Sequence, residues 1–176
     1  RSTLFPYTTL FRSADRVNTS FSGEMTERIS PHLHRWRIDT ITGKVTDEPL
    51  DDRAADFPRI NDAFAGRNAR YGYLGHTREW GAGEAEFDGV TKHDLVAGTS
   101  RTHLYGDDAV AGETVFAADP DGKAEDDGWL LTFVHDRSVD ASHLVVVDAP
   151  TLEEVARVHL PRRVPFGFHG DWFPAV

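Results

Sequence analysis

The stretch from Trp129 to Leu160 decides the fold class. It reads WLLTFVH (129–135), DRSVDAS (136–142), HLVVVD (143–148), APTL (149–152) and EEVARVHL (153–160). Three runs rich in β-branched and apolar residues alternate with short polar segments, which is the pattern of three strands joined by turns. The continuous apolar run from Leu144 to Val147 is typical of a strand covered on both faces. The segment 148–152, with its proline, is expected to turn the chain back.

The same short β-rich runs extend towards the N-terminus as far as Leu33. Residues 34–39 alternate polar and apolar side chains, and a turn centred on Gly43 leads from them into 45–50, which predicts a hairpin. Further strands are expected at 71–74, 86–94, 100–105 and 114–118. No helical period of ten residues or more interrupts them, so the predicted fold class is all-β. Even spacing of short strands fits a sandwich, a barrel or a propeller, and at about 40 to 45 residues per blade a propeller would have three to four blades here.

Composition limits the function classes. The 176 residues are the size of one domain, and 39% hydrophobic residues are enough for a core. No apolar run is long enough to span a membrane, and a net charge of −10 argues against a nucleic acid or an anionic membrane surface as partner. Cysteine is absent, which excludes disulfides and thiolate metal sites and leads us to expect a cytoplasmic protein. Nothing in the sequence indicates an oligomeric state.

Residues 1–13 differ from the rest of the chain. They read RSTLFPYTTLFRS and contain no acidic residue, whereas Asp and Glu are dense from Asp15 onwards. The segment is neither a signal peptide nor an amphipathic transit helix, and it is similar to translated sequencing-adapter DNA. We therefore expect a non-native prefix at 1–13, followed at 14–176 by part of a longer gene product.

Common catalytic and binding motifs are missing. The sequence around Ser100 lacks the second glycine of a nucleophile elbow, and there is no glycine-rich phosphate loop. The acidic segment ADPDGKAEDDG (118–128) does not have the ligand spacing of an EF-hand, so we expect a solvated loop between two strands.

Histidine is the abundant potential ligand, with nine copies. His32 and His34 form an H-x-H pair whose rings would share one face of a strand, but no third ligand lies nearby in sequence, and polar residues on the exposed face of an edge strand explain the pair better. For His93 and His103 a hydrogen-bonded structural role is the default. His169 lies in LPRRVPFGFHGDWFP (160–174), where aromatic surroundings leave an imidazole nitrogen unprotonated for a metal, or simply pack the ring.

Seven motifs occur in a fixed order along the chain. They are Trp36 with Asp39 and TGK (42–44), DFPRIN (56–61), RYGY (70–73), GVTKHDL (89–95), GETVF (112–116), EDDGWL (125–130) and VPFGFHG (164–170). This succession resembles the C-terminal part of the carotenoid cleavage oxygenases, including the bacterial lignostilbene and apocarotenoid dioxygenases. The resemblance runs from about Leu33 to the end of the chain.

The resemblance implies a seven-bladed β-propeller, of which this chain would be the C-terminal blades, with Fe(II) held by four histidines. His169 matches one ligand, and the other three belong to parts of the family sequence upstream of Leu33. Glu113 matches a glutamate that accepts a hydrogen bond from the second nitrogen of a ligand histidine. Asp56 matches another such position, where the family usually has glutamate, and its shorter side chain withdraws the carboxylate by one methylene.

The implied activity is oxidative cleavage by O₂ of one carbon–carbon double bond in a carotenoid, apocarotenoid or stilbene, which gives two carbonyl products. Phe166, Phe168 and Trp172 are candidate walls of an apolar substrate pocket, or core residues. The alternatives are a non-enzymatic β-propeller binding module in which His169 is structural, and an inactive remnant. One histidine of four cannot hold Fe(II) firmly, so the chain alone is expected to be inactive.

Overall fold

A computed structural model describes residues 7–8, 31–77, 86–165, 167 and 169–174. Within these ranges the secondary structure is almost entirely β, with one short 3₁₀ helix, η1 (Asp62–Phe64). No helix in the described part of the chain is long and apolar enough to cross a lipid bilayer. The strands are β1 (Tyr7–Thr8), β2 (His32–Ile38), β3 (Val45–Arg59), β4 (Tyr71–His76), β5 (Gly89–Asp94), β6 (Thr99–Leu104), β7 (Ala109–Ala118), β8 (Gly128–Asp136), β9 (Ala141–Asp148) and β10 (Glu154–His159).

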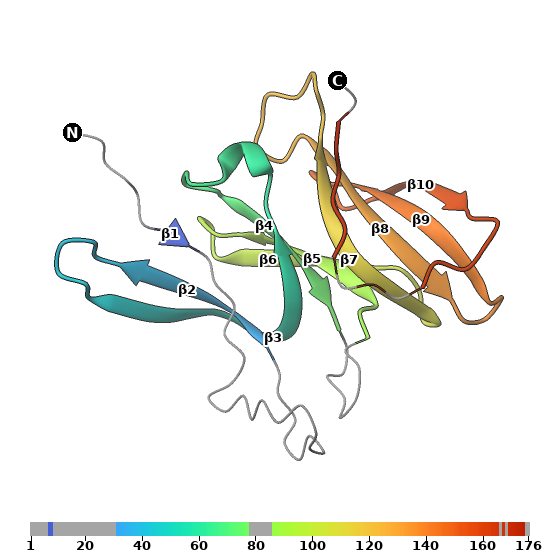
Figure 1. Cartoon of the computed structure of the whole chain (residues 1–176), viewed down its shortest axis with the longest axis horizontal. Coiled ribbons are helices and arrows are strands. Elements are labelled where there is room, and N and C mark those ends of the chain that lie inside the picture. The colour runs from blue at the N-terminus through green and yellow to red at the C-terminus, as the bar shows by residue number, and fades with distance from the viewer. Residues whose placement is uncertain (1–6, 9–30, 78–85, 166, 168, 175–176) are drawn as a thin grey trace, which may run out of the picture.

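The strands form two antiparallel meanders. The first sheet has the order β1-β2-β3-β4-β5-β6, and the second has the order β10-β9-β8-β7. Each strand pairs with its neighbour in sequence, as short connections favour in antiparallel sheets. The two sheets lie against each other, and the segment after β10 returns across β7 (Figure 1). The all-β prediction is confirmed, and so is the hairpin of β2 and β3, whose turn has Gly43 at a φ of 70°.

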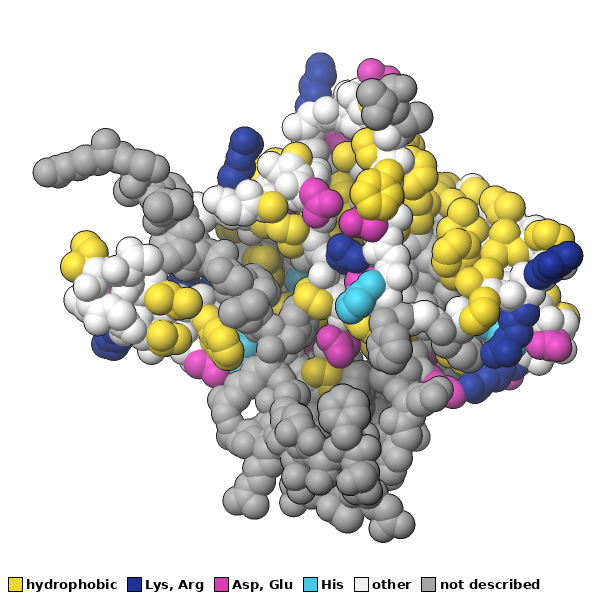
Figure 2. Space-filling view, viewed as in Figure 1, with side chains coloured by type: hydrophobic (Ala, Val, Ile, Leu, Met, Phe, Trp, Pro, Cys, Tyr) yellow, Lys and Arg dark blue, Asp and Glu magenta, His cyan; other side chains and the backbone are white. Residues whose placement is uncertain are grey.

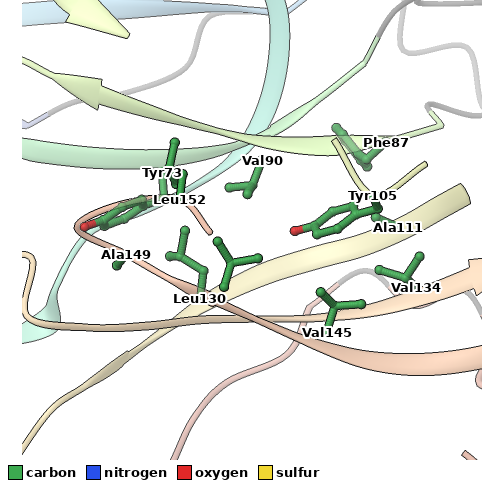
Figure 3. Packing of buried hydrophobic residues seen from close by; sticks show 11 residues of the cluster. Tyr73, Phe87, Val90, Tyr105, Ala111, Leu130, Val134, Val145, Ala149 and Leu152 are labelled. Atoms are coloured by element: carbon green, nitrogen blue, oxygen red, sulfur yellow. The ribbon is translucent and has the colours of Figure 1, made fainter. Parts of the chain in front are cut away.

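The main hydrophobic core lies between the two sheets (Figure 3). Period-two alternation supplies it, because every second side chain of a strand faces the same side. In β9 the side chains of Val145 and Val147 are fully buried, whereas Leu144 and Val146 are only half-buried. The core residues are Tyr73, Phe87, Val90, Tyr105, Ala111, Leu130, Val134, Val145, Val147, Ala149 and Leu152.

The prediction that β9 is covered on both faces is wrong for the described part of the chain. Phe133 and Val158 pair with Leu144 on either side, and both are about half exposed. Hydrophobic side chains accordingly gather on the surface over β8 to β10 (Figure 2). The continuous apolar run predicted burial of both faces of β9, but only the face towards the other sheet is buried.

A triangle of buried hydroxyl groups fixes β7 within the core. The Thr132 hydroxyl is hydrogen-bonded to the hydroxyls of Thr114 and Tyr105, at oxygen–oxygen distances of 2.7 and 2.8 Å. The hydroxyl oxygens of Tyr105 and Thr114 are 3.3 Å apart. Burial raises the pKa of Tyr105 to about 12. Each hydroxyl has a partner, which removes the cost of burying it.

A buried lysine joins the two sheets, and we call its contacts the Lys92 tether. The ammonium of Lys92 on β5 donates to the Asp126 carboxylate at 2.6 Å and to the Ala149 carbonyl at 2.8 Å. It also lies 4.3 Å from the centre of the Tyr71 ring. The exposed fractions of the Lys92 and Asp126 side chains are 6% and 15%. A charge this deeply buried requires partners of this kind.

The acidic segment after β7 connects two strands, as predicted, but its end is not simply solvated. Glu125 accepts the backbone N–H groups of Arg70 and Tyr71 at 2.7 and 2.8 Å. The side-chain amide of Asn61 donates to the Glu125 carbonyl at 2.9 Å. The carboxylates at 125 and 126 therefore attach the β7–β8 loop to the first sheet.

Candidate functional site

Glu113 lies at an irregular point of β7. The register of β7 against β8 shifts between Ala111 and Thr114, so Gly112 and Glu113 occupy a β-bulge. A bulge turns a side chain away from the regular alternation and is common next to functional sites. The carboxylate it places here is only 6% exposed.

Two hydrogen bonds attach Glu113 to distant segments, and a third joins those segments to each other. The three residues involved and His169 define the Glu113 cluster. Arg59 Nε donates to Glu113 Oε1 at 3.0 Å, and the Gly170 N–H donates to Oε2 at 2.8 Å. Arg59 Nη2 also donates to the Gly170 carbonyl at 2.6 Å. The end of β3, the bulge of β7 and the segment after β10 thus meet around one carboxylate (Figure 1).

The imidazole of His169 lies beside this carboxylate. Its Nδ1 is 3.4 Å from Glu113 Oε2, which is longer than a normal N–H···O hydrogen bond, and its side chain is 73% exposed. The Phe57 ring meets it edge-on, with ring centroids 5.5 Å apart and planes at 78°. A carboxylate facing Nδ1 favours the proton on that nitrogen and leaves Nε2 as the potential metal ligand. The residues present therefore fit one imidazole ligand with its supporting carboxylate.

Asp56 lies near the end of β3, three residues before the Arg59 that contacts Glu113. Its Oδ1 accepts the N–H of Phe57 at 2.8 Å, and the register of β3 against β4 shifts between Asp56 and Arg59. Phe57 has a φ of 53°, an uncommon left-handed conformation for an aromatic residue. Within the described part of the chain Asp56 contacts no histidine, so its predicted role stays a prediction.

The aromatic residues predicted to line a substrate pocket are less informative. Trp172 is 47% exposed, and its backbone N–H donates to Asp171 Oδ1 at 2.8 Å. Phe166 and Phe168 lie outside the described residues. Their predicted role as pocket walls stays a prediction.

The other candidate histidines have protein partners. His34 Nδ1 is 2.7 Å from Asp47, and His103 Nδ1 is 3.1 Å from the Leu152 carbonyl. Burial lowers the pKa of His93, which lies 3.6 Å from Asp51. The H-x-H interpretation assumed regular alternation of side chains along the strand. A β-bulge between His32 and His34 interrupts that alternation. Among the described residues no three His, Asp or Glu side chains are grouped so that they could hold a metal ion.

Two contributors to the site were not singled out from the sequence. Arg59 and Phe57 belong to the DFPRIN motif, which marked Asp56 alone as a candidate. Arg59 also lies at the edge of an open groove of about 560 Å³, whose apolar walls include Leu33, Pro58 and Leu74. The sequence feature that could have indicated Arg59 is its position three residues after the candidate carboxylate of Asp56.

Comparison with known proteins gives a consistent result. The family model described as "Retinal pigment epithelial membrane protein" (RPE65) matches residues 3–174. A carotenoid cleavage oxygenase of Mycobacterium tuberculosis is 45% identical over 149 residues, which is 83% of this chain and 30% of that protein. The apocarotenoid-15,15'-oxygenase of Synechocystis is 31% identical over 167 residues, which is 92% of this chain and 34% of that protein.

Solved structures agree. Cobalt-substituted Synechocystis ACO superimposes with a TM-score of 0.80 at 29% identity, over 96% of this chain and 36% of that one. An ACO/RPE65 chimera gives the same TM-score at 27% identity. These structures are β-propellers, and the two sheets described here match part of that fold. The chain spans about a third of the length of the relatives it matches.

Proposed function

Because this chain belongs to the RPE65 and carotenoid cleavage oxygenase family, we propose that it forms part of a non-haem Fe(II) dioxygenase. The complete enzyme would cleave one carbon–carbon double bond of a carotenoid, apocarotenoid or stilbene with O₂ and release two carbonyl products. The relatives are named for carotenoid and apocarotenoid cleavage, which supports the first two substrate classes. Such polyenes are apolar, and burial of apolar surface would supply most of their binding free energy.

The observation that carries the proposal is the position of the Glu113 carboxylate beside Nδ1 of His169. Imidazole ligands of metals commonly direct their second nitrogen to a carboxylate, which fixes the tautomer and the ring orientation. A related solved structure is of a cobalt-substituted enzyme, which supports a metal site in that protein. Fe(II) held by neutral imidazoles such as His169 would keep its positive charge and could supply O₂ activation.

The described residues would perform three tasks. The negative charge of Glu113 favours the proton on Nδ1, so that the Nε2 lone pair of His169 stays available. The edge of the Phe57 ring restricts rotation of the imidazole. The Gly170 N–H, bound to Glu113, ties the backbone beside His169 to β7. We further propose that Asp56 supports a second ligand histidine, and that Phe166, Phe168 and Trp172 lie near the substrate.

The other three ligands would come from the part of the relatives' length that this chain does not span. We therefore expect the 176-residue chain alone neither to bind iron tightly nor to cleave a stilbene. Turnover by this chain would refute that expectation.

The test is the iron content of the complete protein, purified with residues 14–176 joined to the rest of its coding sequence. We expect about one iron per chain, and loss of that iron in His169→Ala. The matched control is His34→Ala, because His34 also pairs with a carboxylate but lies outside the Glu113 cluster. A complete protein without stoichiometric iron would refute the oxygenase proposal and favour a non-enzymatic β-propeller that binds a partner.

A further inference from the structure

We propose that Arg59 is a positioning residue for His169, and that it acts by clamping the Glu113 carboxylate and the Gly170 carbonyl together. The inference rests on the proposed function only in treating His169 as a metal ligand. Arg59 does not touch the imidazole in the contacts described. Its effect passes through the Glu113 carboxylate beside that ring and through the backbone of the next residue, Gly170.

The geometry of the clamp is specific to a guanidinium. Arg59 uses two different nitrogens, Nε towards Glu113 at 3.0 Å and Nη2 towards the Gly170 carbonyl at 2.6 Å. These N–H groups have a fixed angle within one plane, so binding both partners fixes the position of each relative to the other. A lysine ammonium is a single point donor on a flexible stem and cannot impose that angle.

The clamp completes the attachment of Gly170. Its N–H donates to Glu113 Oε2, and its carbonyl accepts from Arg59. Both backbone polar groups of the residue after His169 are therefore held by the strands β7 and β3. The segment itself belongs to no strand, so these contacts are what keep the imidazole beside the carboxylate.

Local structure at the end of β3 is arranged to deliver the arginine. Arg59 pairs with Tyr73 after the register shift that begins at Asp56, and Phe57 within this bulge adopts its left-handed φ of 53°. The Phe57 ring packs on Phe87, with centroids 5.2 Å apart. A strained conformation held by packing persists only where the surroundings determine it, and here it directs Phe57 and Arg59 to the same cluster.

A second arginine of the chain offers a matched control. Arg101 also donates through two nitrogens, to the Pro150 carbonyl at 2.7 Å and to the Thr151 carbonyl at 3.2 Å. It makes the same kind of two-point contact between the sheets, but none of its partners belongs to the Glu113 cluster. Arg101→Lys therefore has the chemistry of Arg59→Lys at a site without a candidate ligand.

The experiment uses the metal-free 176-residue chain labelled with ¹⁵N, in wild-type, Arg59→Lys, Arg59→Gln and Arg101→Lys forms. Two quantities are measured by NMR: the hydrogen-exchange rate of the Gly170 amide and the ring ¹⁵N shifts of His169, which report its tautomer. Thermal unfolding of each form is recorded alongside, so that a variant that does not fold is identified.

For Arg59→Lys we expect Gly170 exchange to accelerate by about tenfold or more, because a charge-assisted contact is lost. The two His169 ring shifts should converge as the tautomers mix, and Arg101→Lys should leave both quantities unchanged. Wild-type values in a folded Arg59→Lys or Arg59→Gln overturn the proposal, as does a wild-type Gly170 amide that exchanges like an exposed one. Because no metal is present, this outcome is independent of the iron content that tests the oxygenase proposal.

Discussion

The Lys92 tether and the Glu113 cluster are alike in composition but differ in exposure. Each joins three segments far apart in sequence through one carboxylate and one basic side chain. In the tether, Lys92 and Asp126 are mostly buried and contact each other directly. In the Glu113 cluster the contacts end at an imidazole that is 73% exposed. A closed, buried set of charges holds sheets together, whereas a buried carboxylate beside an exposed imidazole suits the ligand-supporting role that we propose for Glu113.

The largest effect on stability is expected from Lys92→Met. The substitution leaves Asp126 without its cation in a site that is 15% exposed, so the free energy of unfolding should fall by about 3 kcal/mol. Urea unfolding of the chain measures it. The control, Lys44→Met in the exposed hairpin turn, should change it by less than about 0.5 kcal/mol. Equal effects of the two substitutions would remove the distinction drawn for the tether.

A smaller loss is expected from Glu113→Gln. The amide has one acceptor oxygen where the carboxylate has two, so either Arg59 or the Gly170 N–H loses its partner, at a cost of about 1.5 kcal/mol. In the complete protein, iron affinity should fall by about 10- to 100-fold, as for other carboxylates that support ligand histidines. Glu153→Gln, at an exposed turn, serves as control in urea unfolding and in iron titration. Unchanged iron affinity in Glu113→Gln would assign the carboxylate to the fold alone.

An exposed ion pair should contribute less again, and only within a defined pH range. The Arg70 guanidinium, which donates to Asp94, lowers the pKa of Asp94 from 3.8 to about 2. Because the folded pKa is depressed, the contribution is complete above pH 3.8 and is lost as pH falls towards 2. Urea unfolding between pH 5 and 2 should therefore show a stability difference between wild type and Asp94→Asn that shrinks with acid. Since Arg70 is half exposed, added salt should reduce the difference, and one that grows with acid would contradict the assignment.

The smallest effect on stability should come from His169→Ala, although it should have the largest effect on iron. A side chain that is 73% exposed contributes little burial, so the free energy of unfolding should change by less than about 0.5 kcal/mol. Urea unfolding of the chain measures it beside Lys92→Met. A loss approaching that of Lys92→Met would make the imidazole part of the fold and weaken the contrast between the two clusters.

The strands were predictable because their signal is local. The runs at 129–135 and 143–148 lie within β8 and β9, and each run expected further upstream coincides with a strand, in part or in full. The continuation of β3 to Arg59 was not predicted, since Pro58 and the acidic residues before it conceal the pattern. The bulges of β3 and β7 arise in their pairing with β4 and β8. The sequence of one strand does not show how a partner strand pairs with it, so the bulges could not be predicted.

The site was predictable only in part for the same reason. The family resemblance brought Glu113 and His169 together as candidates, and the structure places them side by side. The role of Arg59 could not be predicted, because its contact with Gly170 joins residues 111 positions apart in the sequence. Composition predicted a solvated loop for Glu125 and Asp126. Glu125 instead binds the backbone at the start of β4, and Asp126 binds Lys92 on β5.

The hydroxyl triangle of Tyr105, Thr114 and Thr132 affects the electric field within the core. Three hydroxyls contain three hydrogens for three contacts, so each can donate once and accept once around a ring. The O–H dipoles then run head to tail and largely cancel, in either of two opposite senses of rotation. The triangle can thus anchor β7 in the core while adding almost no net dipole to it.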